Sequence, residues 1–392
     1  MAAMKYDVII IGAGIAGLWL ADRLKRNGYN LIVVDQGAIG GVQTLASQGM
    51  IHGGQKYAID GKVSAHATSI ADMPARWESC FGGWGEVDLA GVHPLSENQI
   101  MWPAGSIIAD AAVFAAAQLV NANTRKLSPD EEPAVLAEMR AAKKFKGRVY
   151  ELPEKVLDVK ELVTAMSAPL RERIFKGTVD ELMPDGQIVI SGTAYRAQVV
   201  IFTAGLGNER ALELMRVKEK LTQRRPLRQI MVKSMTYPLY GHGIVGKPKP
   251  RVTVTSHPLP GGGYVWYLGG SVAEEGATKS DDEAIRFARS EMEDMFPLIN
   301  WAEKEWATWA GDRAEPFDEK GVLPPGPHVH QRGQVLLAWP TKLTFTPALA
   351  DRVMAWMESK NIVPHEKSPL PDLPLADVGS YPWETAVWKT AS

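Results

Sequence analysis

The sequence contains almost no cysteine. Cys80 is the single cysteine among 392 residues, which excludes an intrachain disulfide and a cluster of thiolate metal ligands. This scarcity fits a reducing compartment, and we expect a cytoplasmic protein without a bound metal. The surrounding segment, RWESCFGGW, offers no paired base. We therefore interpret Cys80 as a structural thiol and not as a nucleophile.

Long apolar runs and a strong net charge are also missing. No segment approaches the roughly 18 consecutive apolar residues of a membrane-spanning helix, and the alanine-rich residues 109–120 indicate a short buried helix instead. The apolar start is too short for a secretory signal. The net charge of −2 gives no reason to expect nucleic acid or an anionic membrane as a partner. The length suggests about two to three structural units.

The most informative segment is the first one, YDVIIIGAGIAGLWLADRL. Its apolar run from Tyr6 to Ile11 predicts a parallel strand that is buried on both faces. A glycine-rich turn follows, then a predicted helix over 16–27 and a second buried strand over 31–34 that ends in Asp35. The glycines, at G-x-G-x-x-G spacing, are Gly12, Gly14 and Gly17. Strand, turn, helix, strand and acid together form one dinucleotide-binding unit.

Each part of this motif has a physical role. Gly12 permits the tight turn, Gly14 lets the backbone approach a pyrophosphate, and Gly17 lets the helix pack closely on the strand. The N–H groups at the start of the helix, with its positive dipole end, attract phosphates. The carboxylate of Asp35 accepts hydrogen bonds from a ribose diol. The motif therefore predicts a bound dinucleotide.

Later segments indicate that the nucleotide-binding sheet resumes downstream. Strands are predicted at 174–182, 187–190 and 199–203, and helices at 64–78 and 156–171. We expect an α/β fold with a discontinuous Rossmann-type domain at 1–83, 153–220 and 307–365. Alternating segments and a helix at 281–295 predict an α+β substrate domain with a mostly antiparallel sheet at 84–152 and 221–306. The tail, 366–392, is expected to lie on the surface.

Five segments, in order, resemble the D-amino-acid-oxidase-like flavoprotein superfamily, which includes amino-acid oxidases and dehydrogenases, glycine and sarcosine oxidases, and glycerol-3-phosphate dehydrogenase. They are GAGIAG with Asp35, TLASQGMIHGG, KGTVDEL, VVIFTAGLGN, and AGDRAEP with VLLAWPTKLTFTPALADRV. The resemblance covers nearly the whole chain and implies FAD as the cofactor. The polar segment after Asp35 also favours FAD over NAD, because a simple NAD enzyme has no need of a polar segment that surrounds its cofactor.

The resemblance also implies cofactor contacts at the matching positions. The pyrophosphate would lie against the glycine motif, Ile15, Ala16, Ala204 and Gly205. The adenosine would contact Asp35, Gln36 and the backbone of Val179. The ribityl–phosphate arm would follow Gln43, Thr44, Ser47, Gln48 and Gly49. The pyrimidine edge of the flavin would face Lys342, Leu343 and Thr344.

The last of these loops departs from the family pattern, which is commonly rich in glycine. This chain has WPTKLT there. One interpretation is that Lys342 places a positive charge near the flavin edge, where reduction builds negative charge. The alternative is that Lys342 points to solvent.

Three more residues are candidates for substrate chemistry. Arg313 matches the arginine that binds the substrate carboxylate in the amino-acid-oxidising branch, and a guanidinium suits that task; the alternative is a salt bridge with Asp312 or Glu315. His52 would act as a base or hydrogen-bond donor, or would be structural. Tyr267 would roof the flavin, or would pack within its sheet. The basic run Arg224, Arg225 and Arg228 is interpreted as a solvated face.

These features predict an FAD-dependent oxidoreductase that oxidises the C–N bond of a small carboxylate-bearing amino acid or amine by hydride transfer to flavin N5. Oxygen, a quinone or a protein would accept the electrons, in a homo- or hetero-oligomer. Three alternatives stay open: oxidation of a 2-hydroxy acid or polyol phosphate, a flavin-binding electron-transfer subunit without its own turnover, and an NAD(P)-dependent dehydrogenase.

Overall fold

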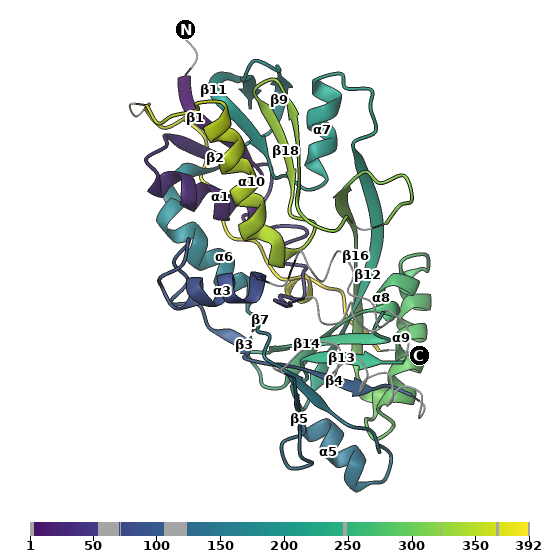
Figure 1. Cartoon of the computed structure of the whole chain (residues 1–392). Helices are drawn as coiled ribbons and strands as arrows, with labels where there is room; N and C mark the ends of the chain where they lie inside the picture. Colours follow the sequence, from purple (N-terminus) through teal and green to yellow (C-terminus); the bar gives the residue numbers. More distant parts are fainter. Residues whose placement is uncertain are drawn as a thin grey trace.

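The described residues form two large sheets joined by a long two-stranded ribbon (Figure 1), and a small separate pair of strands. The computed structural model describes residues 4–53, 70, 72–105, 124–245, 249–322, 324–365 and 368–390. The predicted helix at 109–120 and the first part of the one predicted at 64–78 lie outside these residues. Among the residues described, no helix combines the length and apolar character needed to cross a membrane.

The first sheet has eight strands, in the order β17-β18-β11-β1-β2-β8, with β10 paired to β11 and β9 paired to β10. Its central strands, from β18 to β8, run parallel. Separate parts of the chain therefore build one sheet, as predicted. The strands are β1 (Met4–Ile11), β2 (Leu31–Asp35), β8 (Ile174–Lys176), β9 (Val179–Leu182), β10 (Gln187–Ile190), β11 (Thr193–Phe202), β17 (His328–Arg332) and β18 (Val335–Trp339).

Both faces of this sheet are covered, which explains why β1 is apolar at successive positions. Val8 and Ile10 pack with the helices on one face, and Ile9 and Ile11 pack with β9, β10 and α7 on the other. The helical segments of this part are α1 (Ile15–Arg26), α3 (Met73–Phe81), α6 (Val159–Ser167), η2 (Ala168–Arg173), α7 (Gly207–Leu214), η4 (Leu343–Phe345) and α10 (Thr346–Ser359).

The second sheet has nine strands, in the order β19-β16-β12-β15-β14-β13-β4-β6-β5. Its pairs are antiparallel except for β4 with β13. The strands are β4 (Gln99–Pro103), β5 (Arg125–Lys126), β6 (Tyr150–Leu152), β12 (Thr222–Met235), β13 (Gly241–Ile244), β14 (Val252–Pro258), β15 (Tyr264–Gly269), β16 (Glu305–Pro316) and β19 (Lys389–Thr390). A separate pair joins β3 (Pro94–Ser96) to β7 (Val156–Leu157).

The helical segments beside this sheet are α5 (Ala134–Ala141), α8 (Ser271–Gly276), α9 (Asp281–Met295) and η3 (Trp301–Glu303). α9 begins at a capping box, in which Ser280 and Glu283 each accept a hydrogen bond from the other's backbone N–H. This confirms the predicted start of that helix. On the sheet, Trp266 packs toward α9, whereas Tyr267 belongs to the core that it shares with the first sheet. The inner face of the second sheet therefore borders the nucleotide-binding part.

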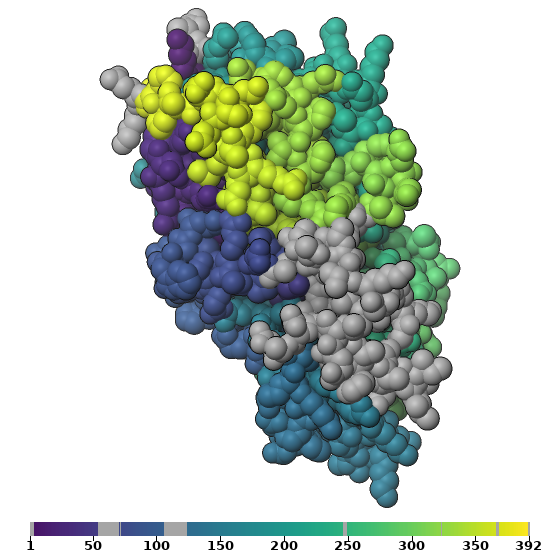
Figure 2. All heavy atoms as spheres, viewed as in Figure 1, coloured from purple at the N-terminus to yellow at the C-terminus, as the bar shows by residue number. Residues whose placement is uncertain are grey.

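The C-terminal tail lies on the surface over much of its length, as expected, but some of its residues are buried. Tyr381 and Trp383 are only 5% and 8% exposed, and β19 extends the second sheet by pairing with β16. Nearer its start, the tail donates the N–H of Ala376 to the carbonyl of Ile174 at 3.0 Å. Figure 2 shows the last part of the chain, in yellow, beside the N-terminal segment in purple. The tail thus packs against both parts of the molecule.

Three predicted boundaries also differ from the structure. The strand Glu305–Pro316 belongs to the second sheet, so residues 307–316 do not belong to the sheet of the nucleotide-binding part. The predicted helix at 156–171 starts later, because Asp158 caps it by accepting a hydrogen bond from the N–H of Glu161. The predicted strand at 174–182 is two strands, because β8 pairs with β2 and β9 pairs with β10.

Candidate flavin and substrate site

The glycine turn between β1 and α1 is packed too closely for side chains. Gly12 has a φ of +106°, and a Cβ added there would lie 2.7 Å from Cα of Ala204. A Cβ on Gly17 would lie 2.0 Å from the carbonyl oxygen of Gly12. These two glycines therefore hold strand, helix and the Ala204 turn together, as the motif predicts.

The start of α1 offers donors for an anion. Its N-cap, Gly14, provides no side-chain cap. The N–H of Ile15 donates to Oγ1 of Thr44 at 3.1 Å, but within the described part of the chain the N–H groups of Ala16 and Gly17 have no acceptor. Unpaired N–H groups at a helix start, beside a glycine that leaves room, fit a pyrophosphate.

Asp35 lies at the end of β2 and faces this turn. Its Oδ2 accepts the N–H of Ala13 at 2.7 Å, and its Oδ1 accepts the N–H of Gly37 at 2.8 Å. A carboxylate has further lone pairs, so these bonds leave room for a ribose hydroxyl. β8 pairs beside Asp35, so the backbone leading to Val179 lies next to it. Gln36 is exposed at the same edge. This arrangement fits the adenosine end of FAD.

The segment from Gln43 to His52 connects the nucleotide-binding part to the second sheet. Gln43 donates to the carbonyl of Asp312 at 2.8 Å, and a Cβ on Gly205 would lie 2.9 Å from Oε1 of Gln43. Gln48 donates to the carbonyls of Thr253 and Tyr267 on β14 and β15, at 3.1 and 3.0 Å. The predicted cofactor segment is thereby fixed to the inner face of the second sheet.

The end of the same segment lies beside the loop before α10. Gly49 is packed so closely that a Cβ there would lie 2.5 Å from the carbonyl of Leu157. Thr344 donates to the carbonyl of Met50 at 3.4 Å, so the two predicted flavin-contacting segments meet. His52 is 6% exposed, whereas Ser47 is half-buried. Lys342 places its ammonium 5.5 Å from the ring centre of Phe345.

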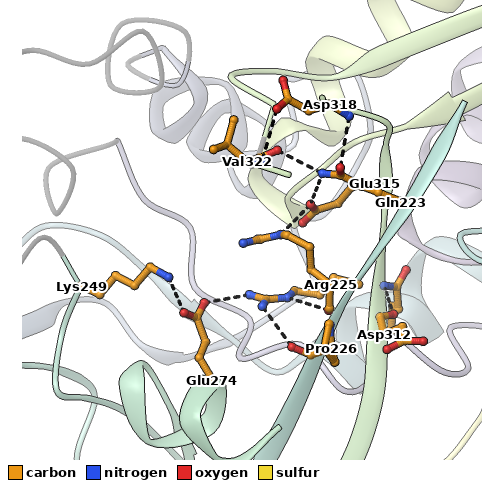
Figure 3. A network of polar contacts seen from close by, with 11 residues as sticks. Gln223, Arg225, Pro226, Lys249, Glu274, Asp312, Glu315, Asp318 and Val322 are labelled. Atoms are coloured by element: carbon orange, nitrogen blue, oxygen red, sulfur yellow. Dashed lines mark hydrogen bonds and ion pairs between the residues drawn. The ribbon is translucent and has the colours of Figure 1, made fainter. Parts of the chain in front are cut away.

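Arg313 projects from β16, one residue after the carbonyl that binds Gln43. Its Nη1 lies 3.2 Å from Oε1 of Glu274, and Nε and Nη2 donate to the carbonyls of Arg225 and Pro226 at 3.4 Å each. Burial lowers the pKa of the Arg313 guanidinium from its usual value, and the charge of Arg225 lowers it further. The ion-pair partner is therefore Glu274 and not Asp312 or Glu315. Figure 3 shows that Glu274 also binds Lys249.

Tyr267 is fully buried, and its hydroxyl donates to the carbonyl of Ala46 at 2.9 Å. Its surroundings favour packing over contact with substrate. It lies in an aromatic cluster with His257, Tyr381 and Trp383. The ring of His257 lies 4.1 Å from that of Trp383, and both of its nitrogens lack a hydrogen-bond partner among the described residues. Burial lowers the pKa of His257 to about 3.

One segment, from Gln43 to His52, links the elements that carry the predicted site residues. Gln43 reaches the strand of Arg313, and Met50, two residues before His52, reaches the loop of Lys342. Among the described residues, no three His, Cys, Asp or Glu side chains are grouped closely enough to hold a metal ion.

A model of the FAD dependent oxidoreductase family, DAO, matches residues 7–356. This chain belongs to the DAO family of FAD-dependent oxidoreductases. Over 390 residues it is 39% identical to the FAD-dependent oxidoreductase PA4991 of Pseudomonas aeruginosa, covering 98% of this chain and 99% of that one. FAD is accordingly the cofactor, and the glycine turn, the start of α1 and Asp35 are the residues that fit it.

Solved structures agree on the fold. The crystal structure of PA4991 superposes with a TM-score of 0.84, 37% identity and coverage of 98% and 99% of the two chains. Glycine oxidase from Geobacillus kaustophilus gives 0.65 at 16% identity, with 96% and 100% covered. L-α-glycerophosphate oxidase from Mycoplasma pneumoniae, with FAD bound, gives 0.61 at 14% identity, with 95% and 98% covered. The last two establish the DAO-like fold and nothing finer.

Sequence reasoning missed two features near the site. The basic run is not a uniformly solvated face, because Arg225 binds the carboxylate of Glu315, which is 1% exposed. The spacing of AGDRAEP contained no hint of that pair; only the register of β12 with β16 reveals it. The tail aromatics were missed because their partner, His257, comes about 125 residues earlier in the chain.

Proposed function

We propose that the protein oxidises the C–N bond of a small carboxylate-bearing amino acid or amine. FAD, when bound, accepts the hydride at its N5. The chain itself supplies the groups that bind and orient the substrate. The DAO fold serves both glycine oxidase and L-α-glycerophosphate oxidase, so it does not decide between amine and alcohol substrates.

The observation that carries the proposal is the position of Arg313. Its strand contacts Gln43 on the cofactor side, and a Cβ on Gly205 would lie 4.0 Å from Cβ of Ala314, the next residue. Its three hydrogen bonds are long, at 3.2 to 3.4 Å, and its one carboxylate partner is shared with Lys249. A guanidinium held this weakly remains able to bind a substrate carboxylate bidentately.

His52, Lys342 and Tyr267 are assigned more limited roles. His52 is proposed to hydrogen-bond the substrate or act as a base, because its segment ends between Thr344 and the second sheet. Lys342 is proposed to lie near the flavin edge. Tyr267 is proposed to position the segment over 46–48 through its bond to Ala46.

The test is an anaerobic titration of the purified flavoprotein. Glycine, sarcosine, proline and other amino acids are compared with 2-hydroxy acids, glycerol phosphate and amines that lack a carboxylate, and bleaching of the flavin absorption is recorded. We expect bleaching by an amine that bears a carboxylate. In R313M, the concentration needed should rise by about 100-fold, while the flavin is retained. Bleaching by hydroxy acids alone, or equally by amines without a carboxylate, would contradict the proposal.

A further inference from the structure

A second arginine lies beside Arg313. β12 and β16 pair so that Arg225 is directly opposite Arg313, and Gln223 is opposite Glu315. Alternate residues of a strand share one face, so these four side chains lie on the same face of the ribbon. Figure 3 shows Arg225 and Glu274 on one side of the ribbon and Asp312 on the other. Two guanidinium groups placed opposite one another repel unless anions offset them.

The guanidinium of Arg225 has a fixed orientation. Its Nε donates to Oε2 of Glu315 at 2.6 Å, and the Glu315 side chain is 2% exposed. Gln223 donates to the same oxygen at 3.4 Å. Gln223 is itself held, because its amide donates to the carbonyl of Val322 and accepts the N–H of Asp318. Arg225 is therefore anchored through Nε by a buried acceptor.

The other edge of the same guanidinium is available. In the part of the chain that the structure describes, Nη1 and Nη2 of Arg225 have no acceptor, and the side chain is 24% exposed. Two parallel N–H groups on a planar fork match the two oxygens of a carboxylate. This edge is the part of Arg225 that a ligand can reach.

The charges of the cluster do not balance. Arg225, Arg313 and Lys249 face two carboxylates, Glu274 and Glu315, which leaves one positive charge without a partner. Burial raises the pKa of Glu274, but Lys249 and Arg313 outweigh it and lower that pKa below its usual value, so Glu274 is already ionised. A further anion on this face would offset the remaining charge.

We infer that Arg225 binds a second carboxylate of the substrate while Arg313 binds the first, so that the preferred substrate is a small dicarboxylic amine. This inference rests on the proposed function. The pyrophosphate of FAD is not the expected anion, because its expected partners are the N–H groups at the start of α1 and not Arg225. The neighbouring Arg224 lies on the opposite face of the ribbon and binds Glu209 of α7.

The experiment compares substrates that differ by one charge and little else. The holoenzyme is reduced anaerobically with aspartate or asparagine and with glutamate or glutamine, in both enantiomers. The half-saturating concentration of the dicarboxylic member should be 10- to 100-fold lower than that of its amide. In R225Q this advantage should disappear, because the half-saturating concentration of each dicarboxylic member should become equal to that of its amide in the same variant.

Two further variants keep the result interpretable. R225Q leaves Glu315 buried without its cation, which is destabilising. The double variant Arg225→Gln with Glu315→Gln removes both charges together and should show the same loss of preference in a folded protein. Arg224→Gln is the matched control, because Arg224 is the next residue, lies on the opposite face and is 55% exposed. Its preference for dicarboxylic substrates should equal that of the parent.

The outcomes separate this inference from the proposed function. If amino acids reduce the flavin but the dicarboxylic and amide members of each pair do so equally, the role of Arg225 is wrong and the proposed function stands. Loss of FAD from the folded double variant would assign Arg225 to the cofactor. A stronger effect of that variant on O-phosphoserine than on aspartate would assign Arg225 to phosphate. Either result overturns the inference. If no amine reduces the flavin, the two-carboxylate site can still be tested by comparing the affinities of glutarate and butyrate, each measured from the change in the flavin spectrum. Equal affinities would refute the site.

Discussion

The two halves of the site are built in different ways. The nucleotide half is built mainly from one short continuous segment, Gly12 to Asp35, and its groups in that segment are backbone N–H groups, missing side chains and one carboxylate. The proposed substrate half is assembled from strands β12, β15 and β16, a helix, a loop and the tail, and its groups are long side chains. Local geometry thus makes the first half, whereas tertiary pairing makes the second.

The largest effect is expected from a methyl group in the nucleotide half. In G17A the new Cβ would lie 2.0 Å from the carbonyl oxygen of Gly12 and 2.8 Å from Oγ1 of Thr203. Because the first of these atoms is backbone, strand and helix must separate, at a cost of at least about 2 kcal/mol. We expect FAD retention to fall by more than about 30-fold, measured as the ratio of flavin to protein absorption after gel filtration.

The control for this prediction is G91A. Nothing lies within 4 Å of a Cβ added at Gly91, so the same chemical change meets no obstacle there. G91A should keep its flavin. Full flavin content in G17A would show that the turn adapts, and the contrast between a rigid nucleotide half and an assembled substrate half would fail.

This contrast also explains what the sequence could predict. β1, α1 and β2 were predicted to within a residue or two, because strand, turn and helix are dictated by neighbours in the chain. The helix at 281–295 was predicted with the bounds that α9 has, for the same reason. By contrast, the alternative interpretation of Arg313 paired it with its neighbours Asp312 or Glu315, whereas its ion-pair partner is Glu274 on α8. Spacing along one strand cannot specify which helix packs beside it.

The tail shows the same limit. Tyr381 donates its hydroxyl to Asp158 at 2.7 Å and stacks on Trp383 at 4.2 Å, and this pair covers His257. Proline and tryptophan in a terminal segment suggested that the tail is exposed. Its burial could not be predicted, because the apolar surface that receives these residues belongs to strands far earlier in the chain. Burial of such a segment depends on a partner surface that the segment itself does not encode.

His257 gives a smaller, pH-dependent effect in the substrate half. Burial lowers its pKa to about 3 from the usual 6.5, and the charge of Asp158 opposes this only in part. Between these values the unfolded chain binds a proton that the folded protein does not, so stability is complete above about pH 6.5 and falls as the pH drops. From pH 6.5 to 5 the loss should be about 2 kcal/mol. Urea unfolding at pH 7.5 and 5 measures it.

H257F should remove this part of the pH dependence while keeping a ring against Trp383. Tyr267 and Tyr381, the other titratable groups of the cluster, stay protonated over this range, because burial raises the pKa of both. The matched control is H93Q, since the His93 side chain is 83% exposed, and it should retain the full dependence. An unchanged pH dependence in H257F would mean that the tail opens and solvates His257 well before the protein unfolds.

The smallest effect is expected from the charge of Lys342, which tests whether the loop before α10 belongs to the substrate half. A positive charge near the flavin stabilises the reduced, negatively charged form, so K342M should lower the midpoint potential of the bound flavin. A partly solvated charge contributes about 1 kcal/mol, which corresponds to about 20 mV for a two-electron couple. Equilibration with a dye of known potential measures this midpoint potential without any substrate.

K279M is the matched control, because Lys279 also lies over a ring, that of Phe287 at 5.3 Å, but stands just before α9. Equal potentials for the two variants would mean that the charge of Lys342 lies too far from the flavin to affect its potential. The positive charge of the substrate half would then come from β12 and β16 alone.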